Sequence, residues 1–455
     1  MSLVKAPQTF RSRIIYAGSW VLAGHVVSQV LRLVGNLILT RLLVPEMFGI
    51  LAVANIFLVG LALFSDFGLQ PNIIQSKRGD EPIFLNTIWT VQIIRGGVIW
   101  MMACGLALAL YLMNAAQLWP INSVYAEPIL PYVIVVISFN AVINGFDSTK
   151  IATVNRNLSL GILTRIELLS QLAGLTCMVV WAYIDRSIWS LVMSTFVTST
   201  LKMILSHVWI PGIRNNLYWD KDVFKDIFHF GKWIFVASIV GFLAMNGDRI
   251  LLGSLVAPQI LGIYVIAFYL VEAFRLVLDR IVGSVIFPSL SEVVRNGNIE
   301  LRGTYYRMRL PIDIVSLMGA GFVFASGSLI IEILYDDRYM MAGHMMEVLC
   351  VSMIGIRYTV TGALFLAMGK PQLLLAIALM RLLPLYILLP MFYSLFGLDG
   401  ALWISGGSIL FSLPIVFYFK IKYSILDIAK EIYTLPLLIV GYILGLLANY
   451  FYAIL

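Results

Sequence analysis

The sequence predicts an all-α integral membrane protein made of two parallel six-helix repeats and one further C-terminal helix. Hydrophobic residues make up 60% of the chain and charged residues only 12%, and the mean hydropathy is +0.93. A soluble domain does not need so much apolar surface. Backbone that faces lipid must satisfy its own hydrogen bonds, and the alternating pattern of a membrane barrel is absent, so the predicted spans are helices.

Long apolar runs define the elements in chain order, because about 20 apolar residues cross the hydrocarbon core as a helix. We expect spans near 16–40, 46–66, 84–112, 128–149, 158–183, 187–210, 230–254, 260–288, 309–332, 344–368, 371–396, 399–419 and 434–454. The basic N-terminus resembles the start of a signal peptide. Its apolar run is too long, however, and Arg32 interrupts it, so we expect a retained first span.

The polar segment 211–229 divides the first twelve spans into two sets of six. We expect an N-terminal lobe at 1–215, a C-terminal lobe at 216–425 and an accessory helix at 426–455. Six is an even number, so both sets would enter the membrane from the same side as parallel repeats. In the last helix, Gly441-x3-Gly445 fits close helix packing.

A repeated pattern supports the division into halves. The matching positions are Gly18-Ser19-Trp20 with Gly231-Lys232-Trp233, Pro45-x-x-Phe48-Gly49-Ile50 with Pro258-x-x-Leu261-Gly262-Ile263, Ala54 with Ala267, and Asp66 with Asp279. All of these matches keep the same offset without a gap. A long membrane protein built from two similar halves is typical of transporters.

The distribution of Lys and Arg predicts the orientation. With the N-terminus inside, the outer segments hold only Arg41, Arg186 and Arg338, whereas the inner segments collect many basic residues, Arg309 and Lys420 among them. This asymmetry follows the positive-inside rule. The net charge of +7 is therefore mainly a topology signal, and basic residues spread thinly over short loops do not indicate a nucleic-acid partner.

Ionisable residues inside the predicted spans are the candidate functional residues. A charge at mid-bilayer costs at least about 2.5–3.5 kcal/mol, so it usually faces a cavity or a partner. The candidates for binding an anionic substrate are Arg32, Arg41, Arg95, Arg249 and Arg275. The candidates for a gating or ion network are Asp66, Asp248, Glu272 and Asp279.

Each candidate also has a structural interpretation. Arg32 has no acid in its own span, so it either faces a cavity or pairs with another helix. Glu272, Arg275 and Asp279 share one helix face, and they form either a self-neutralising ion ladder or a network around a ligand. The alternatives are snorkelling to the rim for Arg41 and an interfacial pair for Asp248 and Arg249.

The sequence shows no pattern typical of a metal site or of an ATP site. The residues His25, His207, His229 and His344 are scattered without metal-ligand spacing, and the three cysteines lie in apolar runs, so we expect no metal site. No Gly-Lys-Ser/Thr phosphate loop occurs, so we expect neither direct ATP use nor another cofactor.

The order and spacing of several short motifs resemble those of the bacterial oligosaccharide (Wzx-type) flippases of the polysaccharide transporter family. The motifs are Leu39-Thr40-Arg41-Leu42-Leu43-x-Pro45-x-x-Phe48-Gly49, Asp66-Phe67-Gly68-Leu69, Asn155-Arg156-Asn157, Gly247-Asp248-Arg249-Ile250-Leu251-Leu252-Gly253, Gly262-Ile263-Tyr264, Phe287-Pro288 and Ala367-Met368-Gly369-Lys370. The resemblance covers the first twelve spans. Its superfamily also includes the multidrug and toxin extrusion (MATE) transporters and the lipid II flippase.

The resemblance implies a V-shaped, MATE-like pair of lobes in the bacterial plasma membrane, with a cytoplasmic N-terminus. Alternating access would carry an undecaprenyl-diphosphate-linked oligosaccharide to the outer leaflet for surface polysaccharide such as O-antigen or exopolysaccharide. A glycan polymerase and export machinery are the implied further partners. Basic residues of spans 1, 7 and 8 line the cavity in the family, which here points to Arg32, Arg249 and Arg275. Span 2 lacks a basic residue, which favours a sugar-polymer repeat over lipid II.

Two alternative functions remain open. A drug or cation antiporter of the same superfamily would be expected to place an acid in span 1, but residues 16–40 contain no Asp or Glu. A membrane glycan polymerase or ligase would need a large outer loop for catalytic groups. The largest predicted outer loop, 113–127, is short, so we expect a transporter rather than an enzyme.

Overall fold

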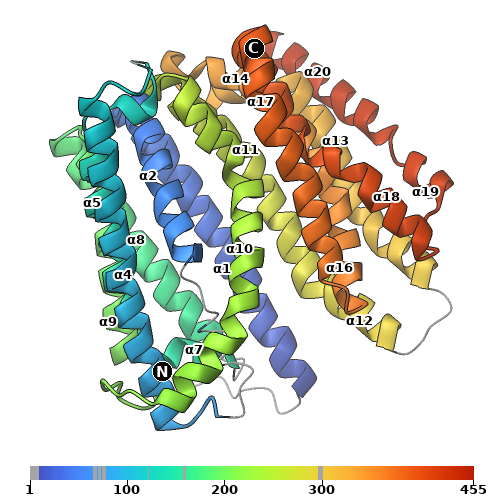
Figure 1. Cartoon of the computed structure of the whole chain (residues 1–455). Coiled ribbons are helices and arrows are strands. Elements are labelled where there is room, and N and C mark those ends of the chain that lie inside the picture. The colour runs from blue at the N-terminus through green and yellow to red at the C-terminus, as the bar shows by residue number, and fades with distance from the viewer. Residues whose placement is uncertain are drawn as a thin grey trace. The chain divides into compact units, whose positions relative to one another are not determined.

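The computed structural model describes residues 10–64, 69, 73, 78–120, 122–156, 160–295 and 301–454. All regular elements in these residues are helical (Figure 1). The chain divides into two compact units, Met1–Ile239 and Val240–Leu455, and α10 contributes to both.

In its described residues the first unit contains nine helices, counting the 3-10 turn η1, and the first part of α10. They are α1 (Phe10–Leu42), α2 (Pro45–Phe64), α4 (Pro82–Ala115), η1 (Val124–Ala126), α5 (Leu130–Ser138), α6 (Asn140–Gly145), α7 (Lys150–Arg156), α8 (Leu160–Ile184) and α9 (Ile188–Val208), followed by α10 (Lys221–Leu255). Pro45 and Pro82 begin α2 and α4, where a missing backbone N–H costs nothing. Helix α8 packs on α1 and α9, and α4 packs on α5 and α6.

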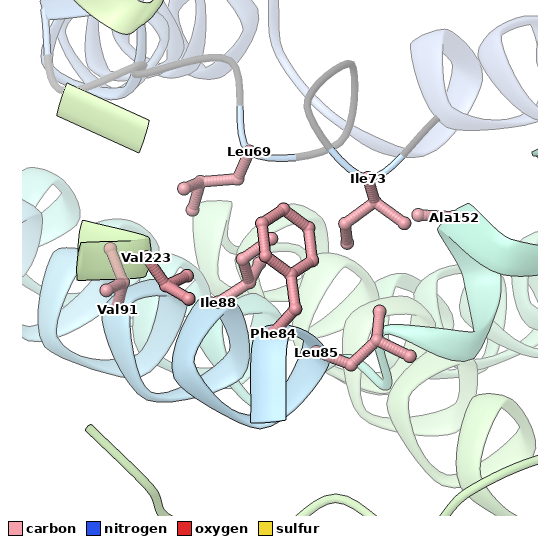
Figure 2. Close-up of a cluster of buried hydrophobic side chains, with 8 residues drawn as sticks. All are labelled: Leu69, Ile73, Phe84, Leu85, Ile88, Val91, Ala152 and Val223. Carbon is pink, nitrogen blue, oxygen red and sulfur yellow. The ribbon is translucent and has the colours of Figure 1, made fainter. Parts of the chain in front are cut away.

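A cluster of buried apolar side chains ties the ends of several elements in this unit together (Figure 2). Its members are Leu69, Ile73, Phe84, Leu85, Ile88, Val91, Ala152 and Val223. They come from α4, α7, the start of α10 and the chain between α2 and α4. Fully burying a side chain such as Phe84 contributes about 1.5–3 kcal/mol, so the cluster fixes the positions of these helix ends.

The helices α5 and α6 cover most of the predicted span 128–149, and at its end, between α6 and α7, the chain bends by 64°. Lys150, which was expected in an inner loop, is buried there, and its Nζ donates to the carbonyl oxygens of His207 and Ile210, each at 2.9 Å. These carbonyls belong to the last residues of α9 and the turn after it. The ammonium of Lys150 thus caps the C-terminal end of α9, where the last carbonyl groups have no N–H donor within the helix.

The second unit contains the end of α10 and the remaining elements. They are α11 (Pro258–Ile281), the π-helix η2 (Val282–Ile286), α12 (Phe287–Arg295), α13 (Leu301–Leu334), η3 (Asp337–Tyr339), α14 (Met341–Leu349), α15 (Val351–Ile354), η4 (Gly355–Tyr358), α16 (Thr359–Ala367), α17 (Gln372–Gly407), η5 (Ser408–Ser412), α18 (Leu413–Lys422), α19 (Ile428–Ile432) and α20 (Leu437–Ile454). Helix α13 begins at Leu301, whereas the prediction placed its start at 309, so Arg309 lies inside the helix.

Helix α17 is interrupted at Gly397, whose φ of 64° and ψ of −148° are not helical. Glycine tolerates this positive φ because it has no Cβ. The interruption lies between the predicted spans 371–396 and 399–419, and it confirms that the apolar run contains two segments.

Helices α13 and α20 are closely packed along their length. A Cβ on Gly321 would lie 2.1 Å from the carbonyl oxygen of Leu438, and one on Gly441 would lie 2.1 Å from that of Met318. Gly445 faces the carbonyl of Phe322 in the same way. The packing role predicted for Gly441-x3-Gly445 is confirmed, since only glycine allows the two backbones to approach this closely.

Nine helical stretches in the described residues are long and apolar enough to cross a membrane, or ten if α5–α6 and α7 form one bent span. Helices α1 and α10, at 33 and 35 residues, correspond to the first and seventh predicted spans. The protein is therefore an all-α, multi-pass membrane protein, as predicted. The repeat and the limits 1–215, 216–425 and 426–455 stay predictions.

Candidate functional site

In the first unit, the predicted basic candidates lie apart. Arg32 is exposed on α1 and makes no ion pair or hydrogen bond with the described residues, and Arg41 is exposed in the last turn of the same helix. Arg95 on α4 donates from Nη2 to the carbonyl oxygen of Ala62 at 2.7 Å. This bond ties α4 to α2. Asp66 lies outside the described residues.

In the second unit, Asp248 and Arg249 are buried on α10. The Oδ2 of Asp248 accepts a hydrogen bond from the hydroxyl of Tyr264 on α11 at 2.5 Å. The guanidinium of Arg249 lies 4.1 Å from the centre of the Phe268 ring, and its Nη2 donates to the carbonyl of Met245 at 2.9 Å. Arg249 is thus held by a cation–π contact and by its own helix.

Arg275 lies between two carboxylates of α11. Its Nη1 is 3.5 Å from Glu272 and its Nε is 3.3 Å from Asp279. These contacts confirm that the three side chains share one helix face, as the spacing predicted. Arg275 is 22% exposed, so its guanidinium is accessible and its present partners are exchangeable.

Arg381 on α17 joins this group. It interacts electrostatically with Arg275, Asp248 and Glu272, and its Nε donates to Ser408 Oγ at 3.2 Å. We call the set of Asp248, Arg249, Glu272, Arg275, Asp279 and Arg381 the arginine–carboxylate cluster. Three guanidiniums balance three carboxylates in it. Such a set can exchange a carboxylate partner for an anionic ligand at little net cost in buried charge.

A second charged group, the buried ion cluster, lies elsewhere in the same unit. It consists of Arg309, Asp313, Arg357, Lys420 and Glu431, which are between 0% and 7% exposed. They belong to α13, η4, α18 and α19. Three cations face two carboxylates, so the cluster carries one excess positive charge.

The carboxylates organise this cluster. Glu431 Oε1 accepts from Arg309 Nη1 at 2.6 Å, from Tyr306 at 2.8 Å and from Lys420 Nζ. The Oδ2 of Asp313 accepts from Arg309 at 3.0 Å and from Arg357 at 3.1 Å. These ion pairs and hydrogen bonds neutralise the buried charges, and they link α13, η4, α18 and α19, which are far apart in the chain.

A family model described as polysaccharide biosynthesis protein matches residues 38–343. This chain belongs to that family. It is 21% identical, over 96% of its length and 89% of the relative, to the lipopolysaccharide biosynthesis protein WzxC of Escherichia coli K12.

Solved structures share the fold of this chain. The lipid II flippase MurJ in an inward closed conformation aligns with a TM-score of 0.66 and 11% identity, over 95% of this chain and 99% of MurJ. An inward-facing MATE family multidrug resistance transporter of the MOP superfamily also aligns with a TM-score of 0.66, at 13% identity, over 87% and 94% of the two chains. The all-α transporter fold predicted from the sequence is confirmed.

Besides Lys150, two further basic residues were misplaced by the sequence-based prediction. Arg309 and Lys420 were expected in inner loops, but both are buried in helices. The helices extend further than the apolar runs because the charges are neutralised in place. In the sequence, only Asp313, four residues after Arg309, indicated that Arg309 has a partner. Nothing near Glu431 indicated that it pairs with Arg309 and Lys420.

Arg381 was not ranked among the site candidates, although a lone arginine in the apolar run 371–396 was a usable signal. The described part of the chain holds no group of three or more His, Cys, Asp or Glu side chains that could bind a metal.

Proposed function

We propose that this protein is a flippase that moves an undecaprenyl-diphosphate-linked oligosaccharide repeat unit from the inner to the outer leaflet of the bacterial plasma membrane. The observation that carries the proposal is the arginine–carboxylate cluster, a set of charges placed among apolar helices. Membership of the polysaccharide biosynthesis family and the fold shared with MurJ support it.

The chemistry of the cluster suits a diphosphate. A diphosphate–sugar head group is anionic and polar, so it cannot cross hydrocarbon unaided. Guanidinium is permanently charged, and its planar fork binds phosphate through paired hydrogen bonds. In the proposed cycle, Glu272 and Asp279 neutralise Arg275 when no substrate is present, and the diphosphate replaces them on binding.

Two other candidate residues, Arg32 and Arg95, have separate roles in this proposal. Arg32 is exposed on α1 and is available to bind the head group, whereas Arg95 holds α2 and α4 together. Alternating access of two lobes releases the substrate unchanged on the other side, so the protein acts as a transporter and not as an enzyme. A cytoplasmic N-terminus and a role before glycan polymerisation and export belong to the same proposal.

Removing the charge of Arg275 or Arg32 is expected to stop transport. In proteoliposomes loaded with a lipid-linked oligosaccharide, Arg275→Ala and Arg32→Ala should reduce flipping roughly tenfold or more, since a charge-assisted hydrogen bond contributes about 1.5–3 kcal/mol. Arg275→Lys should restore flipping only in part, because an ammonium cannot bind phosphate as a planar fork.

Arg338→Ala is the matched control, since Arg338 is exposed and pairs with Asp336. It should flip the substrate at the normal rate. Wild-type flipping by both Arg275→Ala and Arg32→Ala would remove these residues from the site. Export of a cationic dye by the reconstituted wild-type protein, without flipping of the glycan lipid, would favour a drug antiporter instead.

A further inference from the structure

A pocket of about 320 Å³ lies beside the buried ion cluster, between the first turns of α13 and the segment around α19. Its walls include Tyr306, Arg307, Asp313, Lys430, Tyr433 and Thr434. It lies at the end of these helices where charged residues gather, and Arg307, Lys430 and Tyr433 are exposed. The pocket is therefore accessible from outside the protein.

The basic side chains of the pocket are available for a ligand. Arg307 makes no ion pair or hydrogen bond with the described residues, and Lys430 Nζ is 3.9 Å from Asp427, a long contact. Behind them the buried ion cluster adds its excess positive charge. The potential in the pocket favours an anion, and basic pockets between membrane helices bind anionic lipid head groups.

Asp313 sets a second chemical requirement for a ligand of this pocket, besides negative charge. Its Oδ2 accepts from Arg309, Arg357 and Thr434, but its Oδ1 is buried and has no hydrogen-bond partner among the described residues. A buried acceptor without a donor is costly. A ligand that brings a hydroxyl next to its phosphate would satisfy Oδ1 while the phosphate binds the two basic groups.

A second, apolar pocket of about 220 Å³ lies further along α13, where α20 packs against it. Ala320 and Phe324 of α13 and Leu438 and Tyr442 of α20 line it. Ala320 follows Asp313 by seven residues, roughly 10 Å along a helix. The two pockets therefore follow one another along α13 in the order head group and acyl chain.

We propose that these two pockets bind an anionic phospholipid with a hydroxylated head group, of which phosphatidylglycerol is the test case. The phosphate binds Arg307 and Lys430, a head-group hydroxyl donates to Asp313 Oδ1, and an acyl chain lies along α13 and α20. This site uses none of the residues of the arginine–carboxylate cluster, so it is independent of the proposed transport step.

Native mass spectrometry of the full-length protein in a neutral detergent tests the proposal. Phosphatidylglycerol should bind more tightly than phosphatidylmethanol, which has the same charge but no head-group hydroxyl, and both should bind more tightly than phosphatidylcholine. This comparison tests the role of Asp313 without changing the buried ion cluster. Equal binding of all three lipids would overturn the proposal.

The variant R307A/K430A should bind phosphatidylglycerol roughly tenfold or more weakly, because two contacts to the phosphate are lost. The matched control is R214A/K221A, which removes two exposed charges from the first unit and should leave binding unchanged. Arg307 and Lys430 are exposed, so the variant is expected to fold, and an unchanged melting temperature checks this. Unchanged binding by R307A/K430A, or an equal loss in the control, would contradict the site.

Two further measurements distinguish a bound phospholipid from free phosphate and from the transported glycan lipid. Inorganic phosphate should not displace phosphatidylglycerol, because it has no acyl chain. Arg275→Ala should bind phosphatidylglycerol normally even where it no longer flips the glycan lipid. If R307A/K430A lost only the glycan lipid and kept phosphatidylglycerol, the pocket would belong to the substrate and the proposal would fail.

Discussion

Glu431 shows how a single carboxylate can hold several elements of a membrane protein in place. It accepts from Arg309 and Tyr306 on α13 and from Lys420 on α18, and Tyr358 contacts its other oxygen at 3.4 Å. Pairing a buried charge scarcely offsets its desolvation, but removing one partner leaves the others uncompensated. The contribution of Glu431 is therefore seen most clearly when its charge is deleted.

We expect Glu431→Gln to lower the free energy of unfolding by about 3–5 kcal/mol, because three buried cations would then face one carboxylate. Reversible unfolding in mixed micelles measures the effect. The control Asp336→Asn breaks the exposed pair with Arg338 and should cost about 0–1 kcal/mol. Similar losses in the two variants would show that the buried ion cluster adds no special stability.

At the scale of elements, the contact between α13 and α20 depends on the absence of side chains. Gly321, Gly441 and Gly445 each lie against a backbone carbonyl of the partner helix. Lipid is as apolar as leucine, so close packing rather than the hydrophobic effect drives association of these helices. The Gly397 break in α17 shows the other use of glycine, as a residue that permits a positive φ.

Gly441→Ala is expected to weaken the docking of α20, because its Cβ would lie 2.1 Å from the carbonyl of Met318. Overpacking of this kind typically costs about 1–3 kcal/mol. Limited proteolysis at the 423–427 turn should become faster. Gly407→Ala is the control, since a Cβ there meets nothing within 4 Å. Equal cleavage rates for both variants would argue against the glycine contact.

At the scale of the whole molecule, the structure consists of two compact units that share α10. The predicted parallel orientation of two six-helix repeats is a statement about topology, and it follows from the even number of spans and from the positions of Lys and Arg. It can be tested without reference to the arrangement of the two units.

Single cysteines at Lys221 and Arg295 should react with an impermeant reagent from the cytoplasmic side, and cysteines at Ala116 and Asp337 from the opposite side. The background is a variant in which Cys104, Cys177 and Cys350 are alanine. Two predicted spans separate Lys221 from Arg295, so both positions should lie on one side. Labelling of these two positions from opposite sides would refute the predicted topology.

The sequence predicted features that depend on local patterns. Apolar runs located α4 and α11, the spacing of Glu272, Arg275 and Asp279 placed them on one face, and the glycine pair of α20 predicted its packing. Helical periodicity relates residues within a few turns, so these features were accessible without a structure.

Contacts between distant segments were not predictable in this way. Arg309 and Glu431 are 122 residues apart, and nothing in either segment indicates the other. Both Arg309 and Lys420 were therefore taken as loop residues by the positive-inside rule, which describes charges at helix ends but not charges that are neutralised inside a bundle. Arg381 was missed as a site residue for a similar reason, since its neighbours Asp248 and Glu272 lie on other helices.

The excess positive charge of the buried ion cluster has an electrical consequence. One elementary charge carried across the whole membrane field does work of about 2.3 kcal/mol per 100 mV, and a shorter path does a proportional share. Any step that shifts α13 along the bilayer normal must move this charge with it. The resting potential would then favour the state in which the cations lie nearer the negative side, and a transient current in voltage-clamped proteoliposomes would report the shift.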